Sequence, residues 1–204
     1  MDLIRYTLLA DGTSDEVLLP IIDWLMAQHC PAARIVSVFA RDIGPVGNDL
    51  LMRVPAALRN FPCDILFVHR DAERMAREDR LREINEALVD TRIPVVPIVP
   101  IRMTEAWLLA DEGAIRFASG NASGRNPLNL PAKRQWESLP DPKEVLREAL
   151  LVASGRTGRA LGKFRPERVQ SLITRRSESF HALRGLSAFD AFERDLKTQL
   201  QGMA

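Results

Sequence analysis

Residues 3–16 read LIRYTLLADGTSDE, and this stretch decides the fold. Its first eight residues are mostly apolar and stop abruptly at Asp11-Gly12, as a buried strand does where it enters a turn. Thr13 and Glu16 have the spacing of a capping box, which predicts Thr13 as the N-cap of a helix. Apolar side chains then recur at helical spacing on one face, at Val17, Leu18, Ile21, Ile22, Leu25 and Met26.

The alternation of strand and helix continues to about residue 111. The pattern predicts further strands at Arg34–Phe39, Asp64–Val68 and Ile93–Val99, and helices near Leu50–Asn60, Arg74–Val89 and Thr104–Ala110. Pro94 and Pro97 cannot donate to a sheet ladder, so the last strand is expected at the sheet edge. Strands separated by such helices predict an α/β fold with a mostly parallel four-stranded sheet flanked by helices.

The remainder of the chain shows no further strand pattern. A loop rich in Gly, Asn, Pro and Ser spans Ser119–Pro142, and helical patterns follow near Pro142–Ala153, Pro166–Arg176 and Ala188–Gln201. We therefore expect an α/β core over residues 1–118 and a C-terminal loop and helical extension over 119–204, packed on that core.

Composition narrows the class of protein. Of the 204 residues, 46% are hydrophobic and 27% are charged, which excludes a disordered chain. Cys30 and Cys63 are too few for a disulfide framework. The sequence holds no apolar run of about 20 residues and begins without a basic signal-peptide region. We expect a reduced, cytoplasmic protein with no membrane partner, and the sequence leaves open whether it forms a homo-oligomer.

Charge is unevenly divided along the chain. Residues 1–112 hold 12 Lys/Arg against 18 Asp/Glu, whereas residues 113–204 hold 16 against 9. Converging carboxylates in the first part would call for a cation, and the basic second part suits a polyanion. A charge division with no function is the alternative.

Four acidic residues follow the predicted strands at their carboxyl ends. Asp11 follows the first strand, Asp71 and Glu73 follow the third, and Glu105 comes shortly after the fourth. Ligands of open parallel sheets bind at this edge. Clustered carboxylates repel one another unless a cation neutralises them, and oxygen ligands suit Mg²⁺ or Mn²⁺. The alternative is that each acid belongs to an ordinary turn or a solvated strand end.

The same residues resemble a known family. Asp11-Gly12-Thr13-Ser14-Asp15 is similar to the first motif of TOPRIM domains, which is usually Glu-Gly with a downstream acid, and Asp71-Ala72-Glu73 is similar to their Asp-x-Asp motif. The run from Met103 to Asp111 (MTEAWLLAD), together with Leu130-Pro131 and Asp141-Pro142-Lys143, resembles a TOPRIM-like bacterial group, domain of unknown function 4276. The resemblance covers most of the chain.

The resemblance implies a TOPRIM-like, Rossmann-type fold and a Mg²⁺-dependent nuclease of phage defence, with DNA or RNA as substrate. Asp11, Asp71 and Glu73 would hold one or two metal ions, with Glu105 as a further ligand or acceptor. Asp15 is a second-metal ligand or, alternatively, an acid favoured by the helix dipole. Related OLD-type nucleases often work with an ATPase partner, so the alternative function is a non-catalytic subunit that binds and regulates an ATPase. Asp11 and Glu73 each replace the family's usual acid by the other acidic type.

Basic residues supply the other half of the nuclease hypothesis. Arg156, Arg159, Lys163 and Arg165 lie in or beside a glycine-punctuated stretch, SGRTGRALGK, where the backbone can approach a phosphate closely. We expect these four residues to bind nucleic acid, more weakly as salt rises. His69 lies beside the predicted acidic site.

Two other families place acids after strands, and the sequence fits each of them less well. A receiver domain needs a lysine after a fifth strand, and the pattern predicts no fifth strand. A haloacid-dehalogenase phosphatase matches Asp11-Gly12-Thr13, but its nucleophile position is occupied by Leu9, which cannot be phosphorylated.

Overall fold

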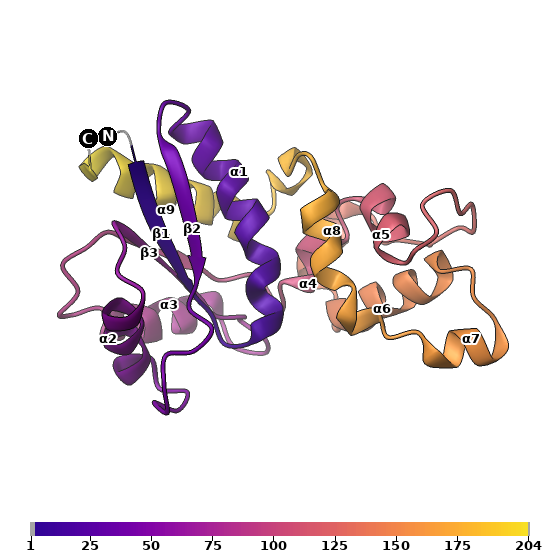
Figure 1. Ribbon diagram of the computed structural model, residues 1–204, viewed down its shortest axis with the longest axis horizontal. Coiled ribbons are helices and arrows are strands. Elements are labelled where there is room, and N and C mark those ends of the chain that lie inside the picture. The colour runs from indigo at the N-terminus through magenta and orange to yellow at the C-terminus, as the bar shows by residue number, and fades with distance from the viewer. Residues whose placement is uncertain (1–2, 204) are drawn as a thin grey trace.

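The computed structural model describes residues 3–203, and its centre is one parallel sheet (Figure 1). The strands pair in the order β2-β1-β3-β4, all parallel. Their bounds are β1 Leu3–Leu9, β2 Arg34–Phe39, β3 Ile65–His69 and β4 Val95–Ile98. The predicted α/β fold with a four-stranded parallel sheet is confirmed. The edge position of β4 is confirmed too, since β4 pairs only with β3 among the described strands.

Helices cover both faces of the sheet because alternate strand residues point to opposite sides. On one face, Tyr6 and Phe67 join a core with α1 (Leu19–His29) and α9 (Ser187–Met203). On the other face, Leu66 and Val68 pack in a second core with α2 (Leu50–Asn60) and α3 (Arg77–Ala87). All five residues of β3 are buried, as expected for a central strand covered on both sides.

The first helical segment begins differently from the prediction. A 3₁₀ helix, η1 (Thr13–Leu18), precedes α1, and Gly12 rather than Thr13 is its N-cap. The acid that closes this start is Asp15, whose Oδ2 accepts a hydrogen bond from the Gly12 N–H at 2.9 Å. The Thr13–Glu16 capping box is therefore wrong by one residue, because two overlapping box patterns exist and the backbone adopts the earlier one.

A helical lobe lies beside the sheet (Figure 1). It contains α4 (Glu105–Leu108), α5 (Glu112–Ala118), η2 (Lys133–Ser138), α6 (Pro142–Ala153), α7 (Gly158–Lys163), η3 (Pro166–Arg168) and α8 (Gln170–Arg176). After a further short turn, η4 (His181–Leu183), the chain returns to the sheet as α9.

Helices from both sides of the expected boundary between residues 118 and 119 pack together in the lobe. Helices α4 and α5 pack against α6 and α8, whereas α9 packs against β4. The helical region is thus inserted between β4 and α9. Burial of apolar side chains holds α9 on the sheet, because Phe189 and Phe192 are fully buried in the core of that face.

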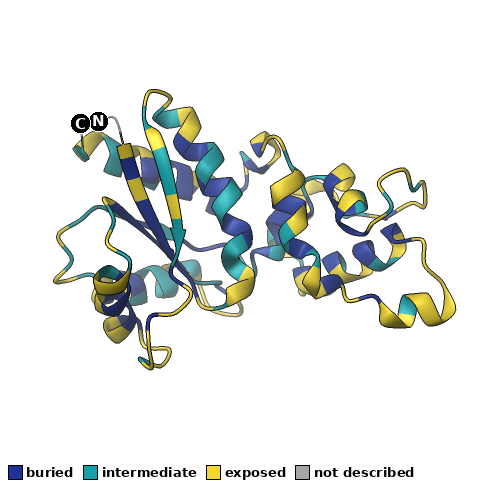
Figure 2. Ribbon diagram, viewed as in Figure 1, coloured by how far each residue is buried: buried dark blue, intermediate teal, exposed yellow. Residues whose placement is uncertain are grey.

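Exposure differs between the two parts. Figure 2 shows the mostly buried strands β1 and β3 in dark blue, β2 in teal and yellow, and a largely exposed α7 at the far end of the lobe. Among residues 3–203, no helix combines the length and the apolar character needed to cross a membrane.

Candidate functional site

The loops that follow β3 and β4 stay paired beyond the ends of their strands. Arg70 N–H donates to the Ile98 carbonyl at 3.1 Å, and Ala72 N–H donates to Pro100 at 3.1 Å. These bonds bring Asp71, after β3, beside the residues that lead into α4. The carboxyl edge of the sheet therefore has an ordered floor on which side chains from several loops converge.

Asp71 is held by Thr104, the N-cap residue of α4. Its Oδ1 accepts hydrogen bonds from the Thr104 backbone N–H at 2.9 Å and from the Thr104 hydroxyl at 3.1 Å. Within residues 3–203, no hydrogen bond reaches the second oxygen, Oδ2. The carboxylate is thus oriented by one oxygen and leaves the other one available.

His69 lies beneath this carboxylate with only 1% of its surface exposed. Its Nδ1 is 3.0 Å from the Ile98 carbonyl, and because a carbonyl only accepts, Nδ1 carries the hydrogen. Nε2 therefore faces the carboxylates, 3.5 Å from Asp71 Oδ1 and 3.9 Å from Asp15 Oδ2. Thr104 Oγ1 lies 3.3 Å from the same nitrogen. The imidazole links acids from two different strand ends.

Glu105 completes an acidic group with Asp15 and Asp71. Burial raises the pKa of Glu105, and the negative charges of Asp71 and Asp15 raise it further, while Lys143 opposes them. Burial also raises the pKa of Asp71, with a contribution from Asp15 that His69 and Thr104 counteract. We call Asp15, Asp71 and Glu105 the acidic cluster.

Asp11 does not join the acidic cluster. Its two oxygens face two arginines, Arg53 Nη1 at 3.1 Å and Arg70 Nε at 3.0 Å. Arg53 is buried and also donates to the Ala10 carbonyl at 2.6 Å, while Arg70 reaches Glu83. The protein's own cations therefore neutralise the acid that the sequence places first among the predicted metal ligands.

Glu73 is also directed elsewhere. Its backbone has a left-handed φ of 52°, and its side chain is 61% exposed. The nearest cation is Arg80, with Nη2 3.7 Å from Glu73 Oε2. Although Glu73 follows the same strand as Asp71, its backbone conformation separates it from the acidic cluster.

Among residues 3–203, no three His, Cys, Asp or Glu side chains are placed to hold a metal ion together. The predicted set of Asp11, Asp15, Asp71 and Glu73 is therefore not assembled. Mg²⁺, however, is usually held by one or two carboxylates together with waters and substrate phosphates. Asp71 and Glu105 fit this smaller requirement, since Asp71 Oδ2 is available and Glu105 forms no ion pair within the described chain.

The four predicted nucleic-acid-binding residues lie far from the acidic cluster. Figure 1 shows α7 at the end of the lobe that is remote from the sheet. Arg156, Arg159, Lys163 and Arg165 are exposed there. Two of them make local contacts: Arg156 stacks 4.4 Å above Phe164, and Arg165 Nη1 donates to the Gly162 carbonyl at 2.8 Å. Their binding of nucleic acid stays a prediction. In the structure these four residues lie in a different part of the molecule from the acidic cluster.

The structure adds Thr104 and Lys143 to the site and gives His69 a role in it. Thr104 precedes Glu105 directly, and Lys143 belongs to the Asp141-Pro142-Lys143 motif. The position of Thr104 before a helix was a usable signal, because hydroxyl residues there commonly bind nearby groups. For Lys143 only the fold brings α6 to Glu105. In comparisons of the chain with protein-family models, curated proteins and solved structures, nothing matches.

Proposed function

We propose that this protein is a Mg²⁺-dependent nuclease of the TOPRIM type, which hydrolyses phosphodiester bonds of nucleic acid in defence against foreign DNA or RNA. The observation that carries the proposal is that Asp71 binds Thr104, the residue directly before Glu105, so that loops after two different strands bring these two acids to the carboxyl edge. Burial raises the pKa of both acids, and neighbouring negative charge adds to it. A cation would relieve that repulsion, and perturbed carboxyls at such an edge are typical of functional sites.

Each residue of the site has a distinct task in this proposal. Thr104 fixes Asp71 through Oδ1 and leaves Oδ2 to bind the metal ion. The Ile98 carbonyl fixes the ring of His69, which holds Asp15 and Asp71 near one another. Lys143 offsets part of the charge of Glu105. Mg²⁺ bound by Asp71 and Glu105 would polarise the scissile phosphate and lower the pKa of a bound water.

The test is cleavage of labelled single- and double-stranded DNA and RNA with Mg²⁺, with Mn²⁺ and with a chelator. We expect metal-dependent cleavage that falls at least about 100-fold in Asp71→Asn, since metal stabilisation of the transition state is worth several kcal/mol. Asp79→Asn is the matched control, because Asp79 pairs with exposed Arg82 on α3. Unchanged cleavage by Asp71→Asn would remove Asp71 from the proposed site.

A second observation favours the alternative of a non-catalytic subunit that binds and regulates an ATPase. Asp11, the acid of the first motif, is already neutralised by Arg53 and Arg70. In this case no substrate is cut with either metal, and crystals soaked in Mn²⁺ show no anomalous density beside Asp71 and Glu105. Density at that position would instead support the nuclease.

A further inference from the structure

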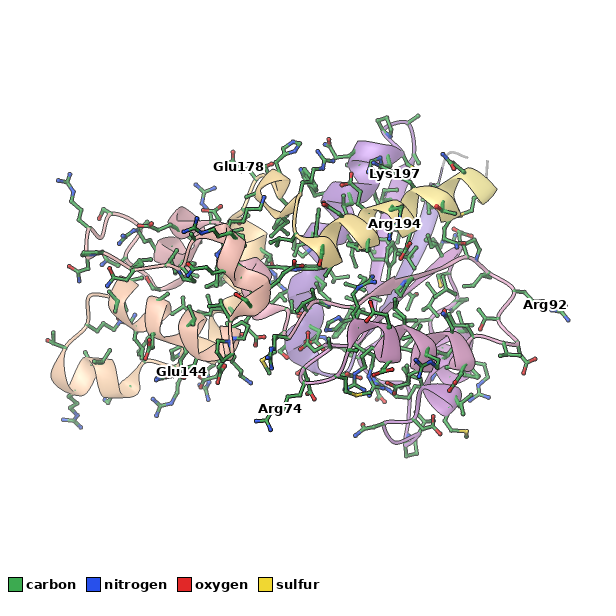
Figure 3. All side chains as sticks on the ribbon, turned by 180° about the vertical axis from the view of Figure 1, so that it is seen from behind. Arg74, Arg92, Glu144, Glu178, Arg194 and Lys197 are labelled. Atoms are coloured by element: carbon green, nitrogen blue, oxygen red, sulfur yellow. The ribbon has the colours of Figure 1, made fainter. Side chains whose placement is uncertain are left out.

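A basic pocket lies between the loops after β3 and β4 and the helix α9, and its lining includes Ala72, the residue after Asp71. Its volume is about 500 Å³, and its lining includes four arginines and two glutamates. The charged lining residues are Arg74, Arg77, Arg102, Arg194, Glu73 and Glu78. Figure 3 shows Arg74 extending away from the body of the protein and Arg194 on α9. We call this the arginine pocket, and its lining carries a net positive charge.

Arg77 has unused hydrogen-bonding capacity in this pocket. Its Nε and Nη2 atoms are buried, yet neither has a hydrogen-bond partner among residues 3–203. A buried donor without a partner costs free energy, and the cost is higher for a charged group. Glu73, one of the two glutamates of the pocket, forms its ion pair with Arg80 and not with Arg77. Arg77 also forms no ion pair among residues 3–203, so an anion in the pocket would offset the charge of its guanidinium.

The backbone of the pocket is strained at two adjoining positions. Glu73 and Arg102 both have left-handed backbones, with φ of 52° and 66°, and the Glu73 N–H donates to the Arg102 carbonyl at 2.7 Å. Non-glycine residues seldom adopt this conformation, and such residues are enriched at ligand sites and switches. The strained pair sets the direction in which Arg102 leaves the loop.

A second pocket adjoins the arginine pocket on the side of α6. This second pocket, of about 320 Å³, shares Glu73, Arg74, Met75 and Arg102 with the arginine pocket and extends to Lys143. The charge of Lys143 acts on Glu105. Basic side chains therefore continue from the arginine pocket past Arg102 to Lys143, with Glu73, Glu78 and Asp141 among the lining residues of the two pockets.

We propose that the arginine pocket binds a phosphate group, supplied by a polynucleotide whose neighbouring phosphodiester reaches the acidic cluster, or by a free nucleotide. Guanidinium groups recognise phosphate oxygens through paired, charge-assisted hydrogen bonds, and several arginines around one opening suit a phosphate better than a single carboxylate. This inference rests on the proposed function for its choice of polynucleotide, and it locates where that substrate is held.

The test measures binding without cleavage. Fluorescence anisotropy of labelled single-stranded DNA and RNA oligonucleotides, in excess EDTA, is compared for the wild type, Arg77→Ala and Arg194→Ala. We expect affinity to fall about tenfold or more for Arg77→Ala and less for Arg194→Ala, with a shallower dependence of affinity on salt. Arg194 is 70% exposed on its helix, so its replacement preserves the fold even if Arg77→Ala does not.

Arg92→Ala is the matched control, because Arg92 is exposed in the turn before β4, away from the arginine pocket (Figure 3). Equal losses for Arg92→Ala and Arg194→Ala, or wild-type affinity in both pocket variants, would overturn the inference. Competition by inorganic phosphate and by a nucleoside monophosphate separates the two sources of the phosphate. Efficient displacement of the oligonucleotide by the nucleoside monophosphate indicates a free nucleotide, and weak displacement by both competitors indicates a polynucleotide. If Arg77→Ala weakens binding and no metal supports cleavage by the wild type, the arginine pocket is supported and the nuclease proposal is contradicted. If the wild type cleaves nucleic acid and the pocket variants bind it as the wild type does, the nuclease is supported and the arginine pocket is contradicted.

Discussion

Glu193, which is buried, and the half-buried acidic cluster have opposite electrostatic surroundings. Glu193 meets His29 Nε2 at 2.8 Å, Arg184 Nη2 at 2.8 Å and Lys197 Nζ at 3.5 Å. Burial alone would raise the pKa of Glu193, but hydrogen bonds from Arg184 and His29 outweigh it and hold the pKa at about 2. In the acidic cluster the pKa of Asp71 and of Glu105 is raised instead.

The two groups of carboxylates differ in how far the protein's own cations neutralise them, and this difference indicates their roles. Glu193 is neutralised by the protein's own cations, which join α1, the turn before α9 and α9 itself, so the network stabilises the fold. The acidic cluster has His69 and Lys143 against three carboxylates, and burial still dominates. Carboxylates at the carboxyl edge of a sheet that the protein's own cations do not fully neutralise are expected to bind a cation from solution.

Replacing Glu193 gives the largest expected effect. Glu193→Gln keeps the shape but removes the charge, and we expect the free energy of unfolding at pH 7 to fall by about 2–3 kcal/mol. The folded-state pKa of about 2 lies below the ordinary 4.5, so this stabilisation is present above pH 4.5 and is lost as the pH falls toward 2. Urea unfolding between pH 3.5 and about 7 measures the difference from wild type.

Glu178→Gln is the control for that experiment, because Glu178 is 88% exposed and its pair with Arg176 should contribute little. A difference between Glu193→Gln and wild type that stays constant with pH would contradict the assignment of the effect to the charge of Glu193.

Magnesium should act on the acidic cluster and not on the Glu193 network. At a Mg²⁺ concentration tenfold above its dissociation constant, binding adds about 1.4 kcal/mol, which raises the thermal midpoint of a chain this size by about 3–6 °C. We expect this rise in the wild type and in Asp11→Asn, because arginines already neutralise Asp11, and its loss in Asp71→Asn. Thermal unfolding with Mg²⁺ and with EDTA measures it. A rise that disappears in Asp11→Asn would return that residue to the metal site.

Glu105→Gln should change stability in the direction opposite to Glu193→Gln. In EDTA at pH 7 the substitution removes a repelling buried charge, so we expect a gain of the order of 1 kcal/mol. The raised pKa of Glu105 means that the folded state holds the proton more tightly. The penalty is therefore absent below the ordinary pKa of 4.5 and grows as the pH rises through the folded-state pKa. Urea unfolding over the same pH range follows the gain, and a loss of stability at pH 7 would show that Glu105 is already compensated.

The sequence predicted which residues reach the carboxyl edge but not which side chains meet there. The strands and the edge position of β4 followed from apolar runs and prolines, whereas the strand order and the contact of Asp71 with Thr104 come from the structure. The direction of Asp11 depends on Arg53, 42 residues away on α2, and no local pattern encodes that pair. The direction of Glu73 depends on a left-handed backbone that residue type does not favour. Position along a strand is a local property, whereas charge compensation is a tertiary one.

Glu73 gives the smallest expected effect and the sharpest distinction between being near the acidic cluster and belonging to it. We expect Glu73→Gln to change the free energy of unfolding by less than about 0.5 kcal/mol, because its pair with Arg80 is long and the side chain is mostly exposed. The Mg²⁺-dependent rise in thermal midpoint should be the same as in the wild type, since Asp71 and Glu105 are untouched. Measuring that rise in Glu73→Gln and Asp71→Asn side by side compares two acids only two residues apart. If both variants lose it, the loop after β3 rearranges around the metal and brings Glu73 into the site, as the Asp-x-Asp motif predicts.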